Sequence, residues 1–253
     1  MQTRRAGGGE GARTATERAA AWIARRGDAI ARSRADALMG RADPGSVVAL
    51  LSPSPGDPAA LRDALEVCDD LRALGDPRVG EWMQEVSAAQ DADGGFGAGR
   101  PLEARLFETG MLAGFASKTR YARPELLDGA GAFLARHWDP DLVRGGSWRP
   151  IAAYAHFFAN ADHADADAIL QWCGRELSRA FLLRAFDAVR TARVLVYCDA
   201  HGLPGAEVHA DELVVALLTE QAADGGFPAD PGAGGRDAVA STLDGLVALR
   251  RLA

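Results

Sequence analysis

The sequence has few cysteines and no long apolar segment. Its 253 residues include three cysteines, Cys68, Cys173 and Cys198, whose spacing matches no disulfide framework or metal motif. So small and odd a number is typical of a reducing compartment, which predicts a cytoplasmic location. The longest stretches without charge, such as residues 150–161, are too short to cross a bilayer, so no transmembrane segment is expected.

The chain also lacks an excess of basic residues. Its 28 lysines and arginines are outnumbered by 35 aspartates and glutamates, which gives a formal charge of −7. Nonspecific binding to nucleic acid or to an anionic membrane needs a positive surface, so neither partner is expected. Glycine, by contrast, is abundant at 29 residues, and its clusters predict turns between the other elements.

The alternation of apolar and polar residues that marks β-strands is absent from the sequence. Apolar residues instead recur three and four positions apart almost everywhere, which predicts an all-α fold. Residues 1–11 have little apolar content, so we expect a flexible tail there and a single domain over residues 12–253. The expected helices span residues 14–38 (opened by a capping box at Thr14 and Glu17, with a break at Gly27-Asp28), 58–74, 78–90, 102–117, 124–137, 148–160, 165–180, 184–200, 206–221 and 236–252.

Two ten-residue segments, 88–97 (AAQDADGGFG) and 219–228 (TEQAADGGFP), are nearly identical. Each places a glutamine at the end of a predicted helix, followed by an aspartate, two glycines and a phenylalanine. The glycines supply the positive φ that ends a helix, the aspartate binds backbone amides, and the phenylalanine fills the space between neighbouring helical pairs. The pattern predicts structural turns and not catalytic sites at Gln90, Gly94, Gly95, Phe96, Gln221, Gly225, Gly226 and Phe227.

The predicted helices fall into pairs, each made of a helix with one polar face, a turn and a more apolar helix. The second helices recur at intervals of about forty to fifty residues, which is the signature of a helical-hairpin repeat. Because they are hydrophobic on more than one face, we expect the second helices inside and the first helices outside.

Residues 224–252, DGGFPADPGAGGRDAVASTLDGLVALRRL, resemble the repeat of the prenyltransferase and squalene–hopene cyclase superfamily. That repeat runs from a glutamine through Gly-Gly-Phe and a Pro-Gly loop to an acidic position, Ser-Thr and an inner helix. Residues 90–117 are similar in a looser way, with Glu108-Thr109 in the place of Ser241-Thr242. The resemblance implies an α/α toroid of about five to six helical hairpins, with an inner ring of helices around a central cavity and an outer ring around them.

The acid with which cyclases of this superfamily protonate an alkene is not intact. Their motif is Asp-x-Asp-Asp-Thr, and alignment of its threonine with Thr242 or Thr109 retains at most one of the three acids, Glu108. Glu108 and Asp237 are the candidate catalytic acids. A salt bridge between Glu108 and Arg105 is the alternative role. The chain has 17 aromatic residues (5 Trp, 3 Tyr and 9 Phe), few for a protein that stabilises carbocations with aromatic rings.

No metal site is predicted. The protein prenyltransferases hold zinc with aspartate, cysteine and a distant histidine, and Cys198-Asp199 with His201 has these residue types in another order. A histidine that interacts with a helix C-terminus is the alternative there. The acidic segment 161–168 (ADHADADA) offers oxygen ligands for a divalent ion, but aspartates at the start of a helix are expected to cap it.

Arginine recurs near the start of each predicted inner helix, at Arg105, Arg149, Arg190 (or Arg184) and Arg236. In a toroid these ends meet at one rim, where guanidinium groups and helix N-termini would bind an anion such as a diphosphate. Salt bridges within the rim are the alternative, because the same region holds Glu103, Glu108, Asp187 and Asp237.

Two functional hypotheses follow. In the first, the chain is a prenyltransferase- or terpene-cyclase-like toroid that binds an isoprenoid, as a prenyl diphosphate, in its central cavity and takes part in terpenoid or other natural-product biosynthesis. A magnesium ion with the diphosphate is the one cofactor that this hypothesis includes. In the second, the chain is a noncatalytic toroid that serves as a lipid- or protein-binding subunit. The repeat favours the first hypothesis, and the incomplete acid and zinc motifs favour the second.

Overall fold

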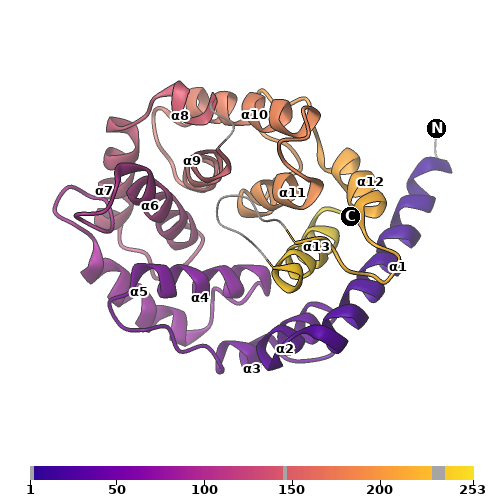
Figure 1. The fold of residues 1–253 in the computed structure, drawn as a ribbon. Helices are drawn as coiled ribbons and strands as arrows, with labels where there is room; N and C mark the ends of the chain where they lie inside the picture. The colour runs from indigo at the N-terminus through magenta and orange to yellow at the C-terminus, as the bar shows by residue number, and fades with distance from the viewer. Residues whose placement is uncertain (1–2, 145–146, 230–236) are drawn as a thin grey trace.

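The computed structural model describes residues 3–144, 147–229 and 237–253, and within these ranges the chain is all-helical, without a strand (Figure 1). The described helices are α1 (Thr3–Arg26), α2 (Ala29–Leu38), α3 (Pro44–Val48), α4 (Pro58–Asp70), α5 (Pro77–Ala89), α6 (Leu102–Ser117), α7 (Pro124–Arg136), α8 (Pro140–Arg144), α9 (Trp148–Asn160), α10 (Ala166–Leu182), α11 (Ala188–Tyr197), α12 (Ala210–Glu220) and α13 (Ala238–Leu252). The all-α prediction is confirmed, and α6 and α9 have the predicted bounds. Helices α3 and α8 were not predicted, because five residues are too few to show a helical period.

The N-terminal segment differs from the prediction. Helix α1 begins at Thr3, inside the segment expected to be a tail, and Thr14 therefore lies within the helix and does not start it. Once a helix has formed, each added residue gains a hydrogen bond at little cost, so a helix can extend beyond a favourable capping sequence. The expected break at Gly27-Asp28 is confirmed: the Asp28 carboxylate accepts a hydrogen bond from the Ala31 amide at 2.7 Å and starts α2.

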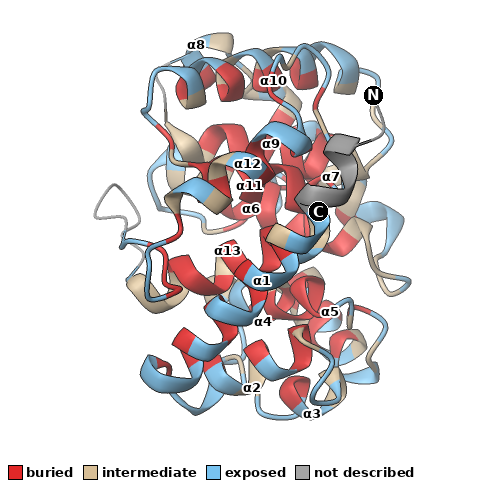
Figure 2. Ribbon diagram, turned by 90° about the vertical axis from the view of Figure 1, so that its right-hand side faces the viewer, coloured by how far each residue is buried: buried red, intermediate tan, exposed pale blue. Residues whose placement is uncertain are grey.

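Five helices, α4, α6, α9, α11 and α13, lie toward the middle of the molecule in Figure 1, and we call them the inner helices. Helix α6 packs against α4 and α9, α11 packs against α9 and α13, and α13 packs against α1 and α2. The inner helices are buried on several faces (Figure 2), and every residue from Pro150 to Phe158 of α9 is buried. Such burial matches their apolar sequences, since a helix that is hydrophobic all round must lie inside.

The two Gly-Gly-Phe turns bind neighbouring helices in the same way. Gln90 Nε2 donates to the carbonyl oxygens of Gly94, within the turn, and of Leu126 in α7, both at 2.9 Å. In the second turn, Gln221 Nε2 donates to the corresponding turn carbonyl and to that of Ala15 in α1, again at 2.9 Å. The second turn therefore joins the C-terminal part of the chain to its first helix.

Each turn is also bound to the inner helix that follows it. The amide of Phe96 donates to Thr109 Oγ1 of α6, and the amide of Phe227 donates to Thr242 Oγ1 of α13, both at 3.0 Å. Both phenylalanine rings are buried. These contacts belong to a structural turn, which fixes the position of α6 relative to α5 in the first case and of α13 relative to α12 in the second.

Helices α7 and α1 face the two turns in the same register. The first glycine of each turn lies against a backbone carbonyl, that of Gly129 in α7 and that of Arg18 in α1. The second glycine lies against a ring four residues further on, that of Phe133 in α7 and that of Trp22 in α1. Helix α1 thus occupies beside the second turn the position that α7 occupies beside the first.

The contact between the second turn and α1 can be tested with Gly225→Ala. Gly225 has φ +99°, and an added Cβ would lie 2.4 Å from the Arg18 carbonyl oxygen. The matched control is Gly99→Ala, since Gly99 has φ +83° but nothing within 4 Å of an added Cβ. We expect Gly225→Ala to lower the free energy of unfolding by about 1–3 kcal/mol more than the control, measured by urea denaturation. Equal losses of stability in the two variants would contradict a close contact between α1 and the second turn.

Candidate functional site

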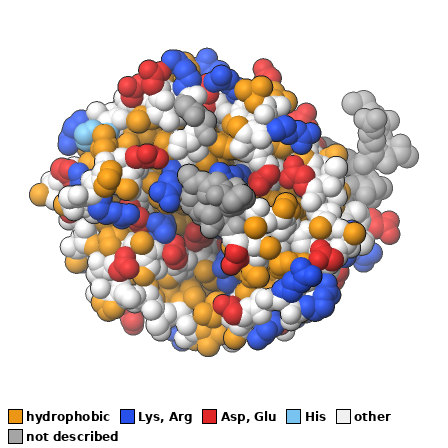
Figure 3. Space-filling view, in the orientation of Figure 1, with side chains coloured by type: hydrophobic (Ala, Val, Ile, Leu, Met, Phe, Trp, Pro, Cys, Tyr) orange, Lys and Arg blue, Asp and Glu red, His pale blue; other side chains and the backbone are white. Residues whose placement is uncertain are grey.

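A cavity of about 480 Å³ lies among the inner helices, toward the N-terminal ends of α9, α11 and α13, and we call it the central pocket. Its lining includes five arginines, Arg34, Arg62, Arg149, Arg190 and Arg193. It also includes three aromatic residues, Phe107, Trp148 and Tyr197, and three carboxylates, Asp63, Glu66 and Asp244. In Figure 3, arginine and lysine side chains lie near the middle of the visible face, among acidic and hydrophobic ones. The pocket therefore offers both charged and aromatic surface to a ligand.

The aromatic residues of the pocket form a connected wall. The ring centroids of Phe107 and Trp148 are 6.2 Å apart, and those of Trp148 and Tyr197 are 6.3 Å apart. Trp148 Nε1 donates to the carbonyl oxygen of Arg190 at 3.1 Å, which fixes the indole between α9 and α11. The guanidinium carbons of Arg62 and Arg149 lie 5.4 Å and 5.2 Å from the Phe107 centroid, within the range of a cation–π contact.

The pocket arginines differ in whether their guanidinium groups form ion pairs with carboxylates. Arg62 donates to Glu108 at 2.8 Å and to Asp63 at 2.7 Å. Arg149 lies over the Phe107 ring but makes no ion pair with any carboxylate in the described parts of the chain. It belongs to the first turn of α9, whose N-cap residue Ser147 makes no side-chain capping bond. The start of a helix that no side chain caps favours an anion, and a guanidinium without an ion pair in the described chain adds a positive charge on its first turn.

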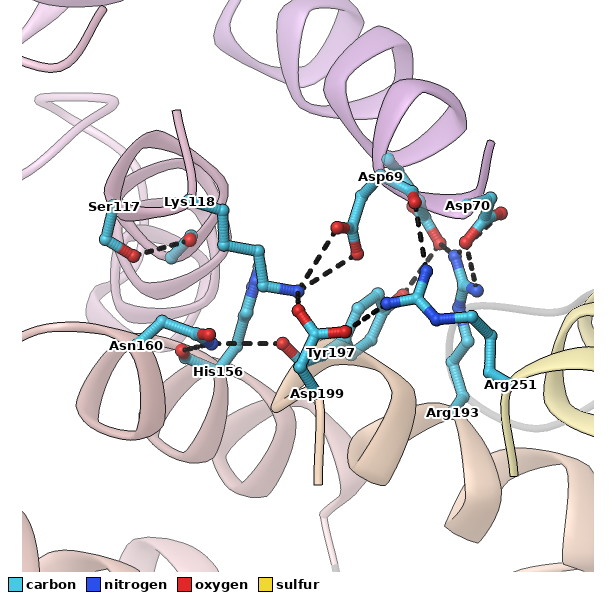
Figure 4. A network of polar contacts seen from close by, with 12 residues as sticks. Asp69, Asp70, Ser117, Lys118, His156, Asn160, Arg193, Tyr197, Asp199 and Arg251 are labelled. Atoms are coloured by element: carbon cyan, nitrogen blue, oxygen red, sulfur yellow. Dashed lines mark hydrogen bonds and ion pairs between the residues drawn. The ribbon is translucent and has the colours of Figure 1, made fainter. Parts of the chain in front are cut away.

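A buried ionic network lies against the pocket and is centred on Arg193, whose side chain is 1% exposed (Figure 4). Arg193 donates to Asp70 and to Glu66, both at 2.5 Å, and Arg34 donates to Asp70 at 3.0 Å. Burial raises the pKa of Asp70 to about 6, and the guanidinium groups of Arg193 and Arg34 oppose this rise. The network ties α11 to α4 and α2.

The second part of the network surrounds Lys118, the single lysine of the chain. Lys118 Nζ lies 3.1 Å from Asp69 and 3.0 Å from Asp199 (Figure 4). Arg251 donates to the Asp69 carbonyl at 3.0 Å and is also bound to the Asp199 carboxylate. These contacts connect the C-terminal ends of α4, α6, α11 and α13.

The structure places two of the four predicted rim arginines, Arg149 and Arg190, in the central pocket. Arg105 lies elsewhere: it binds the carboxylates of Asp91 and Asp93 in the first Gly-Gly-Phe turn, at 3.1 Å and 2.7 Å. Arg236 lies outside the described residues.

Three pocket arginines, Arg34, Arg62 and Arg193, were not predicted from the sequence. Arg193 stands between apolar residues, Ala192 and Val194, and a lone charge in an apolar stretch is the signal in the sequence that could have indicated it. For Arg34 and Arg62 the sequence offers no comparable signal.

The two candidate acids have different surroundings. Glu108 is 1% exposed, and its Oε2 lies 2.8 Å from Arg62 and 3.6 Å from Arg100, so the expected salt bridge with Arg105 is wrong. Arg105 does not pair with Glu108 because its guanidinium is bound to the first Gly-Gly-Phe turn. Burial raises the pKa of Glu108, and the two guanidinium groups oppose the rise. Asp237 is exposed and caps α13, accepting a hydrogen bond from the Ala240 amide at 2.8 Å.

Among the described residues, no three histidine, cysteine, aspartate or glutamate side chains are grouped so that they could hold a metal ion. The Asp199 carboxylate is bound by Lys118 and Arg251, and His201 is exposed. In the acidic segment 161–168, Asp165 stands at the N-cap position of α10 but its side chain makes no capping bond. No described helix has the length and apolar character that a membrane span requires.

Comparisons of the chain with protein-family models, with curated proteins and with solved structures find no match. The geometry of the central pocket and the resemblance of the repeat are therefore the grounds on which a function can be proposed.

His156 of α9 is the one fully buried histidine in the described chain, and neither of its ring nitrogens has a hydrogen-bond partner there. Its ring stacks on Tyr197, with centroids 5.1 Å apart, and meets the edge of Phe115 at 4.4 Å. Burial lowers the pKa of His156 well below 6.5, and the positive charges of Lys118 and Arg193 lower it further. The imidazole is therefore neutral in the folded protein.

The buried imidazole predicts a loss of stability in acid. Because its pKa is lower in the folded state, the unfolded state takes up the proton first, so stability is lost as the pH falls below about 6.5, by up to about 1.4 kcal/mol per unit. We expect His156→Leu to remove about 2 kcal/mol of the loss in unfolding free energy between pH 7 and pH 5, measured by urea denaturation. His201→Leu, at an exposed site, is the control, and an equal pH dependence in both variants would contradict the assignment.

Proposed function

We propose that the chain is an α/α toroid whose central pocket binds an amphipathic ligand with an anionic head group. A prenyl diphosphate is the ligand that the repeat resemblance names. The toroid is supported by the shared register of α7 and α1, because α1 takes the position of the next outer helix after α12 and α13. It is further supported by the packing of α13 against both α11 and α1.

The observation that carries the proposal is the state of Arg149. This guanidinium lines the central pocket, makes no ion pair within the described residues, and lies in the first turn of α9. A free arginine beside helix amides can donate several hydrogen bonds to a phosphate, each strengthened by charge. We therefore assign the head group of the ligand to Arg149.

The aromatic wall supports the second half of the proposal. Phe107, Trp148 and Tyr197 would cover the hydrocarbon part of a ligand whose head group lies at Arg149. A volume of about 480 Å³ falls within the range usual for small-molecule sites. A magnesium ion would neutralise part of the charge of a diphosphate head group.

The surroundings of Glu108 favour binding without cyclase-type turnover. Its carboxylate contacts Arg62 and Arg100, and it does not line the central pocket. A general acid must reach the atom that it protonates. We accordingly place the chain with the noncatalytic toroids, as a ligand-binding protein or subunit.

Binding is tested with Arg149→Gln and isothermal titration calorimetry. We expect the variant to bind geranyl and farnesyl diphosphate at least about ten-fold more weakly than the unmodified protein, with and without magnesium, because a charged hydrogen bond is lost. Farnesol, which has no anion, should bind both proteins equally. Arg175→Gln is the matched control, since Arg175 also lies over a ring, that of Trp172 at 4.5 Å, but on the outer helix α10. Unchanged affinity of Arg149→Gln would refute the assignment.

Turnover is tested separately. We expect no cyclised product when the protein is incubated with geranyl, farnesyl or geranylgeranyl diphosphate and magnesium, followed by mass spectrometry of an organic extract. A cyclised product that disappears in Glu108→Gln would instead establish an enzyme whose acid is Glu108.

A further inference from the structure

We infer that Glu66 is a second recognition point of the central pocket, where the ligand donates a hydrogen bond from a hydroxyl or ammonium group. This inference rests on the proposed function, because it concerns another part of the same ligand. Its basis is a pocket-lining carboxylate with one oxygen fully engaged and the other without a donor in the described chain.

The two oxygens of Glu66 are used unequally. Oε1 accepts hydrogen bonds from Arg193 Nη2 at 2.5 Å and from the Tyr197 hydroxyl at 2.7 Å. In the described chain nothing donates to Oε2, although the side chain is 25% exposed and lines the central pocket. A carboxylate oxygen can accept two hydrogen bonds, so Oε1 is saturated while Oε2 keeps its full capacity.

The neighbours of Glu66 make it an acceptor and not a donor. Burial favours the neutral acid, but Arg193 and Tyr197 hold the pKa of the Glu66 carboxyl below its ordinary value. Burial raises the pKa of the Tyr197 hydroxyl, which therefore stays protonated and donates to Glu66. An ionised carboxylate has no proton to offer, so the ligand must supply the donor.

The nearest arginine on the same helix does not fill this role. Arg62 stands one turn before Glu66 in α4, but its guanidinium donates to Asp63 and Glu108. The open oxygen of Glu66 is thus not the unused half of an internal ion pair with Arg62.

The aromatic wall connects this acceptor to the anion position. Arg149 lies over Phe107, Phe107 contacts Trp148, Trp148 contacts Tyr197, and Tyr197 donates to Glu66. A ligand lying along this wall would place an anionic head at Arg149 and a polar group at Glu66. The pocket therefore fits a hydrocarbon chain with an anion near one end and a hydroxyl or ammonium group near the other.

The test compares three ligands of equal length by isothermal titration calorimetry: geranyl diphosphate, its 8-hydroxy derivative and its 8-amino derivative. We expect one of the two substituted ligands to bind the unmodified protein at least about ten-fold more tightly than geranyl diphosphate, and the better of the two identifies the donor. In Glu66→Gln we expect this preference to fall below about two-fold.

Asp63→Asn is the matched control, because Asp63 also lines the pocket from α4 and its loss removes the same charge. A preference that Asp63→Asn abolishes and Glu66→Gln leaves intact would overturn the inference. Equal binding of all three ligands to the unmodified protein would also overturn it, without depending on any variant, and would leave the proposed function standing. Failure of all three ligands to bind would overturn both proposals.

Discussion

The buried ion pair between Arg193 and Asp70 is the contact on which the polar interior of the molecule depends. Both side chains are 1% exposed, and the contact joins α11 to α4 across 123 residues of sequence. Removing a guanidinium from water is costly, and the cost is offset only when partners satisfy its donors with good geometry. Asp70 and Glu66 accept hydrogen bonds from the two Nη groups, whereas the buried Nε makes no hydrogen bond in the described chain and lies 3.7 Å from Asp244. Removal of one partner alone would leave an uncompensated charge, which typically costs about 3–5 kcal/mol.

The pocket depends on this pairing. Because Arg193 holds one oxygen of Glu66 and stacks on Tyr197 at 4.6 Å, the acidic end of the aromatic wall is fixed before any ligand arrives. The neutral state of His156 follows from burial, which lowers the pKa of the imidazole, and the positive charges of Lys118 and Arg193 lower this pKa further. The central pocket is therefore not a purely apolar cavity, because charged side chains line it beside the aromatic ones.

Most helices could be predicted from the sequence, whereas most of the pocket could not. The helical period is a local property, so α6 and α9 were placed correctly from the spacing of their own apolar residues. The partners of a buried charge are not local. Glu108 was expected to pair with Arg105 one turn earlier, but its partner, Arg62, lies 46 residues away in α4. Helical spacing alone cannot identify such a pair, because both partners are polar residues in otherwise ordinary helices.

The two Gly-Gly-Phe turns bind helices of different sequence, α7 and α1, through the same backbone groups. Gln90 and Gln221 bind backbone carbonyls, and each first glycine presses against a backbone carbonyl, so neither contact depends on the side chains of α7 or α1. Side chains add to these backbone contacts, since Phe133 of α7 and Trp22 of α1 lie against the second glycine of each turn. The same backbone contacts let the second turn bind α1, the first described helix, which also packs against α13, the last. Helix α13 carries Asp244, which lines the central pocket 3.7 Å from Arg193.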